Sequence, residues 1–175
     1  MDDLWPPRAI VNDGLPYPAE WKDFLGVAWR LLDEVAGHPS HGACKSMMAR
    51  SFRKIATVHR MTGTRTYIQT GLAQRGLGLG WRHRDPEAVR PYYEAMPVSL
   101  GVAILKAPVD VLERRNVERG KDRSYMLADM VRPLEIAEEV LKARGVPVKV
   151  IDTTRTRQKC RARLVEFAES LGATV

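Results

Sequence analysis

Two short apolar segments, separated by a long helical stretch, limit most strongly what this chain can fold into. Leu100–Lys106 and Val148–Ile151 have the length and residue types of buried β-strands. The residues between them carry apolar side chains at three- and four-residue steps, which is typical of helices. Strands joined through helices pair in parallel through right-handed crossovers. We therefore predict the α/β class, as a three-layer α/β/α arrangement with a mostly parallel sheet.

The rest of the chain predicts further helices and a third strand, within a single domain over residues 1–175. Residues 1–18 are rich in proline and form an irregular entry segment around a short strand at 8–11. Arg65–Thr70 is the third strand, and Gly76–Gly80 is predicted to be a flexible or closely packed connection. The predicted helices cover residues 18–36, 44–60, 85–95, 109–118, 124–144 with a bend at Pro133, and 156–171.

Composition and charge indicate a cytoplasmic protein with an anionic partner. The 175 residues carry a net charge of +7, and an excess of positive charge attracts nucleotides, nucleic acids or acidic proteins. Cys44 and Cys160 lack metal-ligand spacing, so we expect two free thiols in a reducing compartment. The N-terminus does not resemble a secretory signal, and no apolar run is long enough for a membrane span.

A group of arginines follows the strand Leu100–Lys106, and this order of parts resembles a known family. Leu100–Arg123 places a strand, then Ala107-Pro108, then a helix rich in arginine. This segment is similar to the strand, helix and arginine-bearing lid of P-loop kinases, of the nucleoside, thymidylate and phage nucleotide-modifying groups. Three further segments resemble parts of these kinases in the same order: Thr66–Arg75, Asp85–Pro97 and Val148–Thr154. The resemblance covers residues 64–172, and the kinase-like region is incomplete at its N-terminus.

The resemblance implies a phosphotransferase that uses ATP and Mg²⁺. The γ-phosphate of a nucleoside triphosphate would pass to a nucleoside, a nucleotide or a modified base in DNA, and the lid near 114–123 would neutralise the charge that develops. The implied catalytic residues are Arg115, Arg119 and Arg123. The implied nucleotide-binding residues are Arg114, Asp152 and Thr153, and those for the acceptor are Arg75, Gln69 and Trp81.

Several of these residues also have an ordinary structural interpretation. Arg115 and Arg119 can form a solvated basic helix end, and Arg75 can be a surface arginine. Asp152, or one of the two threonines that follow it, can cap a helix. Trp81 can pack in the core. We predict no metal-binding residues, because the four histidines and two cysteines have no ligand spacing.

The phosphate-binding loop of the family is missing, and this leaves two explanations open. The motif requires G-x-x-x-x-G-K-[ST], whereas Gly37–Ser46 has two residues between Gly42 and Lys45. Gln69 and Thr70 stand where the family carries acids. In the first explanation the chain is the C-terminal portion of a kinase whose first strand and phosphate loop were lost, are encoded by another open reading frame, or precede an incorrectly assigned start codon. In the second it is a non-catalytic basic module that keeps the fold and binds a partner without turnover. The second alternative would bind nucleic acid or a partner subunit through helices 45–60 and 155–163.

Overall fold

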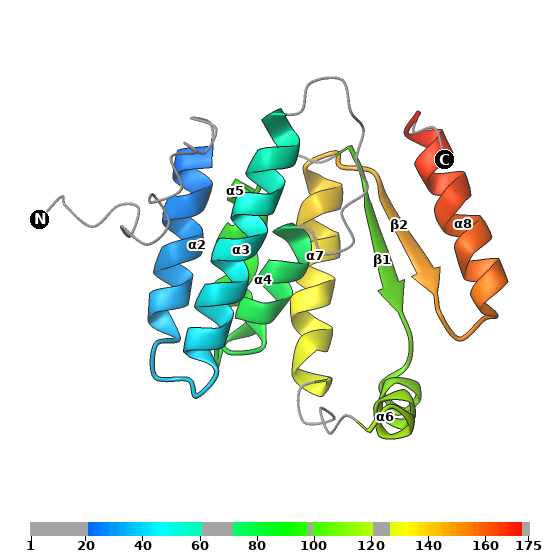
Figure 1. The fold of residues 1–175 in the computed structure, drawn as a ribbon, viewed down its shortest axis with the longest axis horizontal. Helices are drawn as coiled ribbons and strands as arrows, with labels where there is room; N and C mark the ends of the chain where they lie inside the picture. The colour runs from blue at the N-terminus through cyan, green and yellow to red at the C-terminus, as the bar shows by residue number, and fades with distance from the viewer. Residues whose placement is uncertain (1–20, 61–71, 98–99, 121–126, 173–175) are drawn as a thin grey trace, which may run out of the picture. The chain divides into compact units, whose positions relative to one another are not determined.

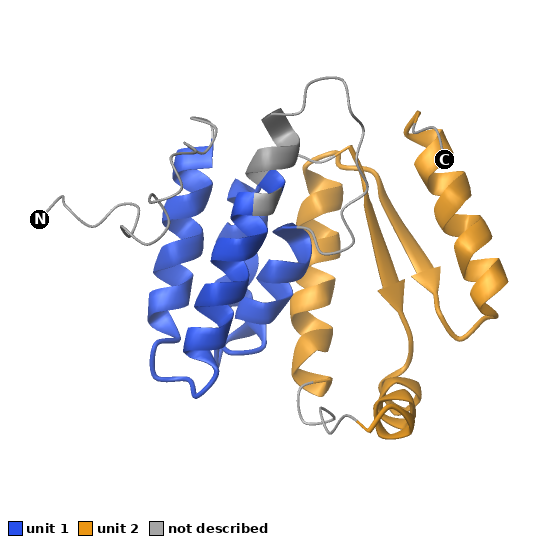
Figure 2. Ribbon diagram, in the orientation of Figure 1, with its two compact units in different colours: residues 1–97 blue, residues 98–175 orange. Residues whose placement is uncertain are grey.

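The computed structural model describes residues 21–60, 72–97, 100–120 and 127–172, and the chain divides into two compact units (Figures 1 and 2). Unit 1 comprises residues 1–97 and unit 2 residues 98–175. We describe each unit by itself. The entry segment 1–18, the strands predicted at 8–11 and 65–70, and the site residues Gln69 and Arg123 lie outside the described residues.

Unit 1 consists of helices throughout its described residues, packed around an aromatic core. Its elements are α2 (Lys22–Glu34), α3 (His41–Arg60), α4 (Leu72–Gly80), the 3₁₀ helix η2 (Pro86–Val89) and α5 (Arg90–Ala95). The apolar spacing in α2 buries Phe24, Ala28 and Leu32, as the sequence predicts. The cap predicted at Asp85 is also present, because its Oδ1 accepts a hydrogen bond of 2.9 Å from the amide of Glu87.

The prediction of a connection at Gly76–Gly80 is wrong, because these residues form the second half of α4, whereas the close packing offered as one alternative is confirmed at Gly76. Gly76 lies directly beneath two tyrosines of α5, with Tyr93 Cζ only 2.6 Å from where a Cβ atom would stand. The hydroxyls of Tyr92 and Tyr93 donate hydrogen bonds to the carbonyl oxygens of Leu72 and Ala73, at 2.8 and 3.1 Å. Packing against α5 therefore outweighs the low helix propensity of glycine here.

Unit 2 contains a two-stranded parallel sheet and is otherwise helical in its described part. Strand β1 (Val102–Lys106) pairs in parallel with β2 (Val148–Asp152), in register from Val102 opposite Val148 to Lys106 opposite Asp152. The helices are α6 (Val109–Glu118), the 3₁₀ helix η4 (Ala128–Met130), α7 (Val131–Ala143) and α8 (Arg157–Ser170). The structure thus shows the mixed helix and strand class and the parallel pairing that the sequence predicts.

Helices α7 and α8 contact opposite faces of the sheet (Figure 1). Lys106 Nζ, at the end of β1, lies 2.6 Å from Glu138 Oε2 on α7. Gly101 directly precedes β1 and lies against Phe167 and the C-cap residue Leu171 of α8. Residues an odd number of positions apart in an extended chain lie on opposite faces, and Gly101 and Lys106 are five apart. Pro133 was expected to bend a long helix, but it lies in the first turn of α7, where its missing N–H has no helical partner to lose.

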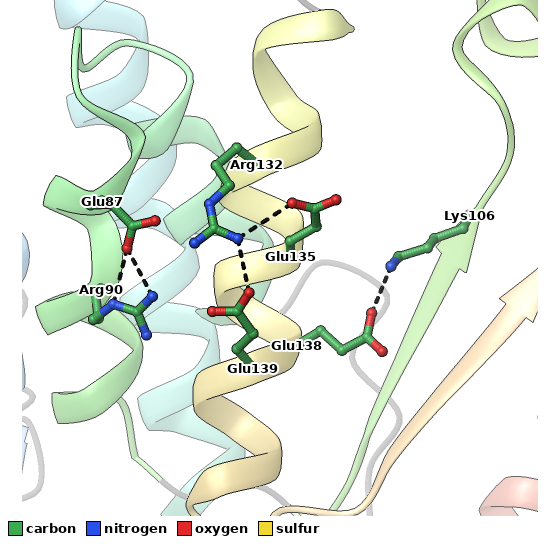
Figure 3. A network of polar contacts seen from close by, with 7 residues as sticks. All are labelled: Glu87, Arg90, Lys106, Arg132, Glu135, Glu138 and Glu139. Carbon is green, nitrogen blue, oxygen red and sulfur yellow. Dashed lines mark hydrogen bonds and ion pairs between the residues drawn. The ribbon is translucent and has the colours of Figure 1, made fainter.

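An ionic contact ties β1 to α7 and makes the stability of unit 2 depend on pH (Figure 3). Glu138 accepts hydrogen bonds from Lys106 at 2.6 Å and from Lys142 at 2.7 Å. The bond from Lys106, followed by that from Lys142, holds the pKa of Glu138 below its ordinary value. Because the folded pKa is lowered, the stabilisation is present above the unfolded value of about 4.3 and is lost as pH falls through the folded pKa.

We expect Glu138→Gln to lower the free energy of unfolding by about 1 kcal/mol at neutral pH, because it removes the charge from a partly exposed pair. Below the folded pKa of Glu138 the variant and the wild type should be equally stable. Urea unfolding followed by far-UV circular dichroism across this pH range measures the difference. Glu135→Gln, which removes an exposed carboxylate 3.4 Å from Arg132, is the control and should cost less. A difference that persists unchanged in acid would contradict this explanation.

Candidate functional site

Thr153 joins the two strands where they end. Its amide donates a hydrogen bond of 2.8 Å to the carbonyl oxygen of Lys106, the last residue of β1. Its hydroxyl donates a second bond to the same oxygen, at 3.1 Å. We call the residues Lys106, Asp152, Thr153 and Arg115 the carboxyl edge. In open α/β sheets ligands bind in the crevice outside this edge.

Arg115 reaches the carboxyl edge from α6. Its Nη1 donates a hydrogen bond of 3.1 Å to the Thr153 hydroxyl, and its Nη2 donates one to the Thr153 carbonyl oxygen. Figure 1 shows α6 just beyond the points where β1 and β2 end. Arg115 is half-buried. Through these bonds Arg115 and Thr153, which were both predicted to lie at the site, are in direct contact.

The other lid residues take different positions. Arg114 is exposed, with its Nε 3.9 Å from Glu118 Oε1. Arg119 is exposed and is the C-cap residue of α6, which ends at Glu118 as the sequence predicts. Gly120 follows with a φ of 62°, a left-handed conformation that terminates the helix. Among the described lid arginines, Arg115 alone forms hydrogen bonds with Thr153 of the carboxyl edge.

Asp152 is held as an exposed carboxylate at the end of β2. Its Oδ1 accepts hydrogen bonds from the hydroxyl and amide of Thr154, at 2.7 and 2.9 Å, and Arg155 Nε lies 3.7 Å from Oδ2. The bonds from Thr154 lower the pKa of Asp152. A carboxylate with a lowered pKa is a weak general base. The cap of α8 expected among residues 152–154 is Thr156 instead, whose hydroxyl accepts from the amide of Lys159.

Arg75 and Trp81, predicted to bind the acceptor, belong to unit 1. Arg75 lies on α4, with its Nη1 3.8 Å from the sulfur of Met47, and its Nε is buried without a hydrogen-bond partner. Burial lowers the pKa of Arg75. The ring of Trp81 is covered by the Arg82 guanidinium, 4.2 Å from the ring centroid, and meets His38 edge to face. Trp81 therefore packs among neighbouring side chains.

The segment that partly matches a phosphate-binding loop joins two helices. Residues 35–40 turn between α2 and α3, so no strand leads into Gly37–Ser46. Arg82 Nε donates a hydrogen bond of 2.8 Å to the Ser40 hydroxyl, which lies 2.9 Å from His38 Nδ1. This cluster could not be predicted from the sequence, because its members are far apart in the chain and follow no motif. Gly37–Ser46 is therefore a turn followed by the first residues of α3.

The described residues place few carboxylates at the carboxyl edge. Within the described ranges no group of three or more histidine, cysteine, aspartate and glutamate side chains is arranged to hold a metal ion. At the carboxyl edge Asp152 is the one carboxylate, and one of its oxygens is already occupied by Thr154. Mg²⁺ sites in kinases use one or two carboxylates together with substrate phosphates. We therefore assign no step to this ion.

Comparison of the chain with protein-family models, curated proteins and solved structures gave no match. None of the described helices is long and apolar enough to cross a bilayer.

Proposed function

We propose that the carboxyl edge binds the phosphate tail of a nucleoside triphosphate such as ATP, within a three-layer fold of the P-loop-kinase type. The observation that carries this proposal is the bidentate contact of Arg115 with Thr153 at the ends of the two parallel strands. Crevices at this edge of open α/β sheets are the usual place for nucleotide ligands.

The chemistry of the guanidinium supports phosphate binding. Arginine has five N–H donors, and the contacts with Thr153 use two of them. The remaining donors are available to phosphate oxygens, for which a planar fork is well suited. Thr153 fixes the side chain before the ligand arrives, so little conformational freedom is lost on binding.

Phosphoryl transfer requires more than the described residues provide. Asp152 is a weak base, Arg114 pairs with Glu118, and Arg119 is the exposed C-cap residue of α6. In this proposal the chain binds nucleotide, and transfer to a nucleoside, nucleotide or modified DNA base requires a phosphate loop from a partner subunit. Other parts of the proposal are supported by resemblance and composition. They are the acceptor-side residues Gln69, Arg75 and Trp81, the lid residue Arg123, the Mg²⁺ cofactor and a cytoplasmic location.

Calorimetric titration of the full chain with ATP tests the proposal. Arg115→Ala should weaken binding about ten- to hundredfold, because hydrogen bonds to a charged group are worth roughly 1.5–3 kcal/mol. Arg115→Lys keeps the charge but loses the fork, and its affinity should lie between the two. Thr153→Val removes the hydroxyl bonded to Nη1 but keeps the carbonyl oxygen bonded to Nη2, and it should weaken binding less than Arg115→Ala.

Arg114→Ala is the matched control for this titration. It removes an arginine from the same helix, but one that is exposed and pairs loosely with Glu118. Its affinity should stay within about twofold of the wild type, since exposed ion pairs contribute less than about 1 kcal/mol. Equal losses in Arg114→Ala and Arg115→Ala would show that general charge binds the nucleotide, and would overturn the assignment of the edge.

A further inference from the structure

The first half of α8 carries positive charge that lacks carboxylate partners. Arg157, Lys159, Arg161 and Arg163 fall within the first half of the helix, and its first acidic residue is Glu166. None of these four cations forms an ion pair within the described part of the chain. Positive charge near a helix N-terminus also opposes the helix dipole. The arrangement therefore costs stability and brings no folding contact in return.

Cations on α7 are arranged differently. Arg132 lies 2.8 Å from Glu139 and 3.4 Å from Glu135 (Figure 3). Lys142 lies 2.7 Å from Glu138. Helices of the same unit thus differ in whether their cations are neutralised locally. The contrast singles out α8 as a surface that remains open to an external polyanion.

The placement of α8 directs its cations outward. Its apolar side faces the sheet, because Phe167 contacts the position of Gly101 and the Cys160 thiol donates a bond of 3.4 Å to the Asp152 carbonyl oxygen. Arg157 and Arg161 are exposed and lie four residues apart, so they form a row about 6 Å long on one flank. Lys159 and Arg163 form a corresponding row on the other flank.

We propose that this surface, the four cations of α8, binds the phosphate backbone of double-helical nucleic acid. Arginine and lysine on a helix bind phosphates without reading sequence. The aromatic residue of α8, Phe167, is turned to the sheet, so α8 offers no platform for stacking unpaired bases. A duplex is therefore a better partner than a single strand. This activity is separate from nucleotide binding at the carboxyl edge.

Fluorescence anisotropy with a labelled DNA duplex of about 20 base pairs tests the proposal through its salt dependence. Four phosphate contacts give a slope of log K against log salt of about −3.6, which is roughly a hundredfold loss of affinity between 50 and 200 mM salt. The double variant Arg157→Ala, Arg161→Ala should reduce the magnitude of the slope by about 2. Arg157→Glu, Arg161→Glu should weaken binding further. Circular dichroism and unchanged ATP binding show that each variant is folded.

A control with the same change of net charge separates this surface from general attraction. Lys22 and Arg84 are exposed cations of unit 1, and Lys22→Glu, Arg84→Glu changes the charge by the same amount as Arg157→Glu, Arg161→Glu. It should leave the slope unchanged. An equal loss in both double variants would overturn the proposal. Tighter binding of single-stranded DNA than of duplex would also overturn the proposal. Displacement of the duplex by poly-glutamate at equal charge would overturn it as well, and would indicate an acidic protein partner.

Discussion

Replacement of Phe24 by alanine is expected to lower the free energy of unfolding of unit 1 by about 4 kcal/mol. The side chain is 1% exposed and lies at the centre of an aromatic cluster. Its ring centroid is 5.0 Å from that of Tyr92 on α5, 5.4 Å from Phe52 on α3 and 6.5 Å from Trp21. Truncation leaves a cavity among three helices and removes edge-to-face ring contacts, each worth about 0.5–1.5 kcal/mol.

Tryptophan fluorescence during urea unfolding measures this effect in unit 1 alone, because all four tryptophans fall within residues 1–97. Phe24→Leu is the control, since it keeps most of the buried volume and should cost less than about 1.5 kcal/mol. If Phe24→Ala and Phe24→Leu destabilise equally, ring contacts rather than the cavity dominate. If neither destabilises by 1 kcal/mol, the packing described for α2, α3 and α5 is wrong.

Gly76→Ala should destabilise unit 1 by about 2–3 kcal/mol, although alanine is the better helix former. The new Cβ atom would lie 2.6 Å from Tyr93 Cζ and 2.8 Å from Tyr92 Cδ1, closer than atoms in contact can approach. The tyrosines cannot easily withdraw, because both are buried and their hydroxyls are bonded to the carbonyl oxygens of Leu72 and Ala73.

Gly78→Ala provides a matched substitution in the same helix. Its Cβ atom would meet one neighbour, Arg82 Nη1, at an ordinary 3.6 Å. We expect this variant to gain up to about 1 kcal/mol from helix propensity. The same unfolding measurement applies to both variants. Two variants of equal stability would contradict the close packing of α4 on α5.

The parallel sheet could be predicted because its signals are local. The strands begin and end within two residues of the expected positions. Gly101 directly precedes β1, and the turn from Gly145 to Pro147 directly precedes β2. Helix α6 likewise begins directly after Pro108. Apolar periodicity and turn residues are sufficient for such elements.

Other features depend on contacts that the sequence alone does not reveal. The glycines of α4 indicated a loop, because the tyrosines that pack against Gly76 lie far along the chain. At the candidate site, the pairing of Arg115 with Thr153 brings together two residues predicted separately, whereas Arg119 lies exposed at the C-cap of α6, which ends where the sequence predicts. The bond between Lys106 and Glu138 followed no recognisable pattern.

The central claim is that the carboxyl edge of unit 2 binds the phosphates of a nucleotide. Amide NMR spectra of the full chain during a titration with ATP test it most directly. We predict the largest saturable shifts at Thr153, Thr154 and the α6 amides around Arg115, with none of these in Arg115→Ala. Shifts confined to α8 or to unit 1, or no response at 1 mM ATP, where a binding free energy of about −4 kcal/mol is detectable, would contradict the claim.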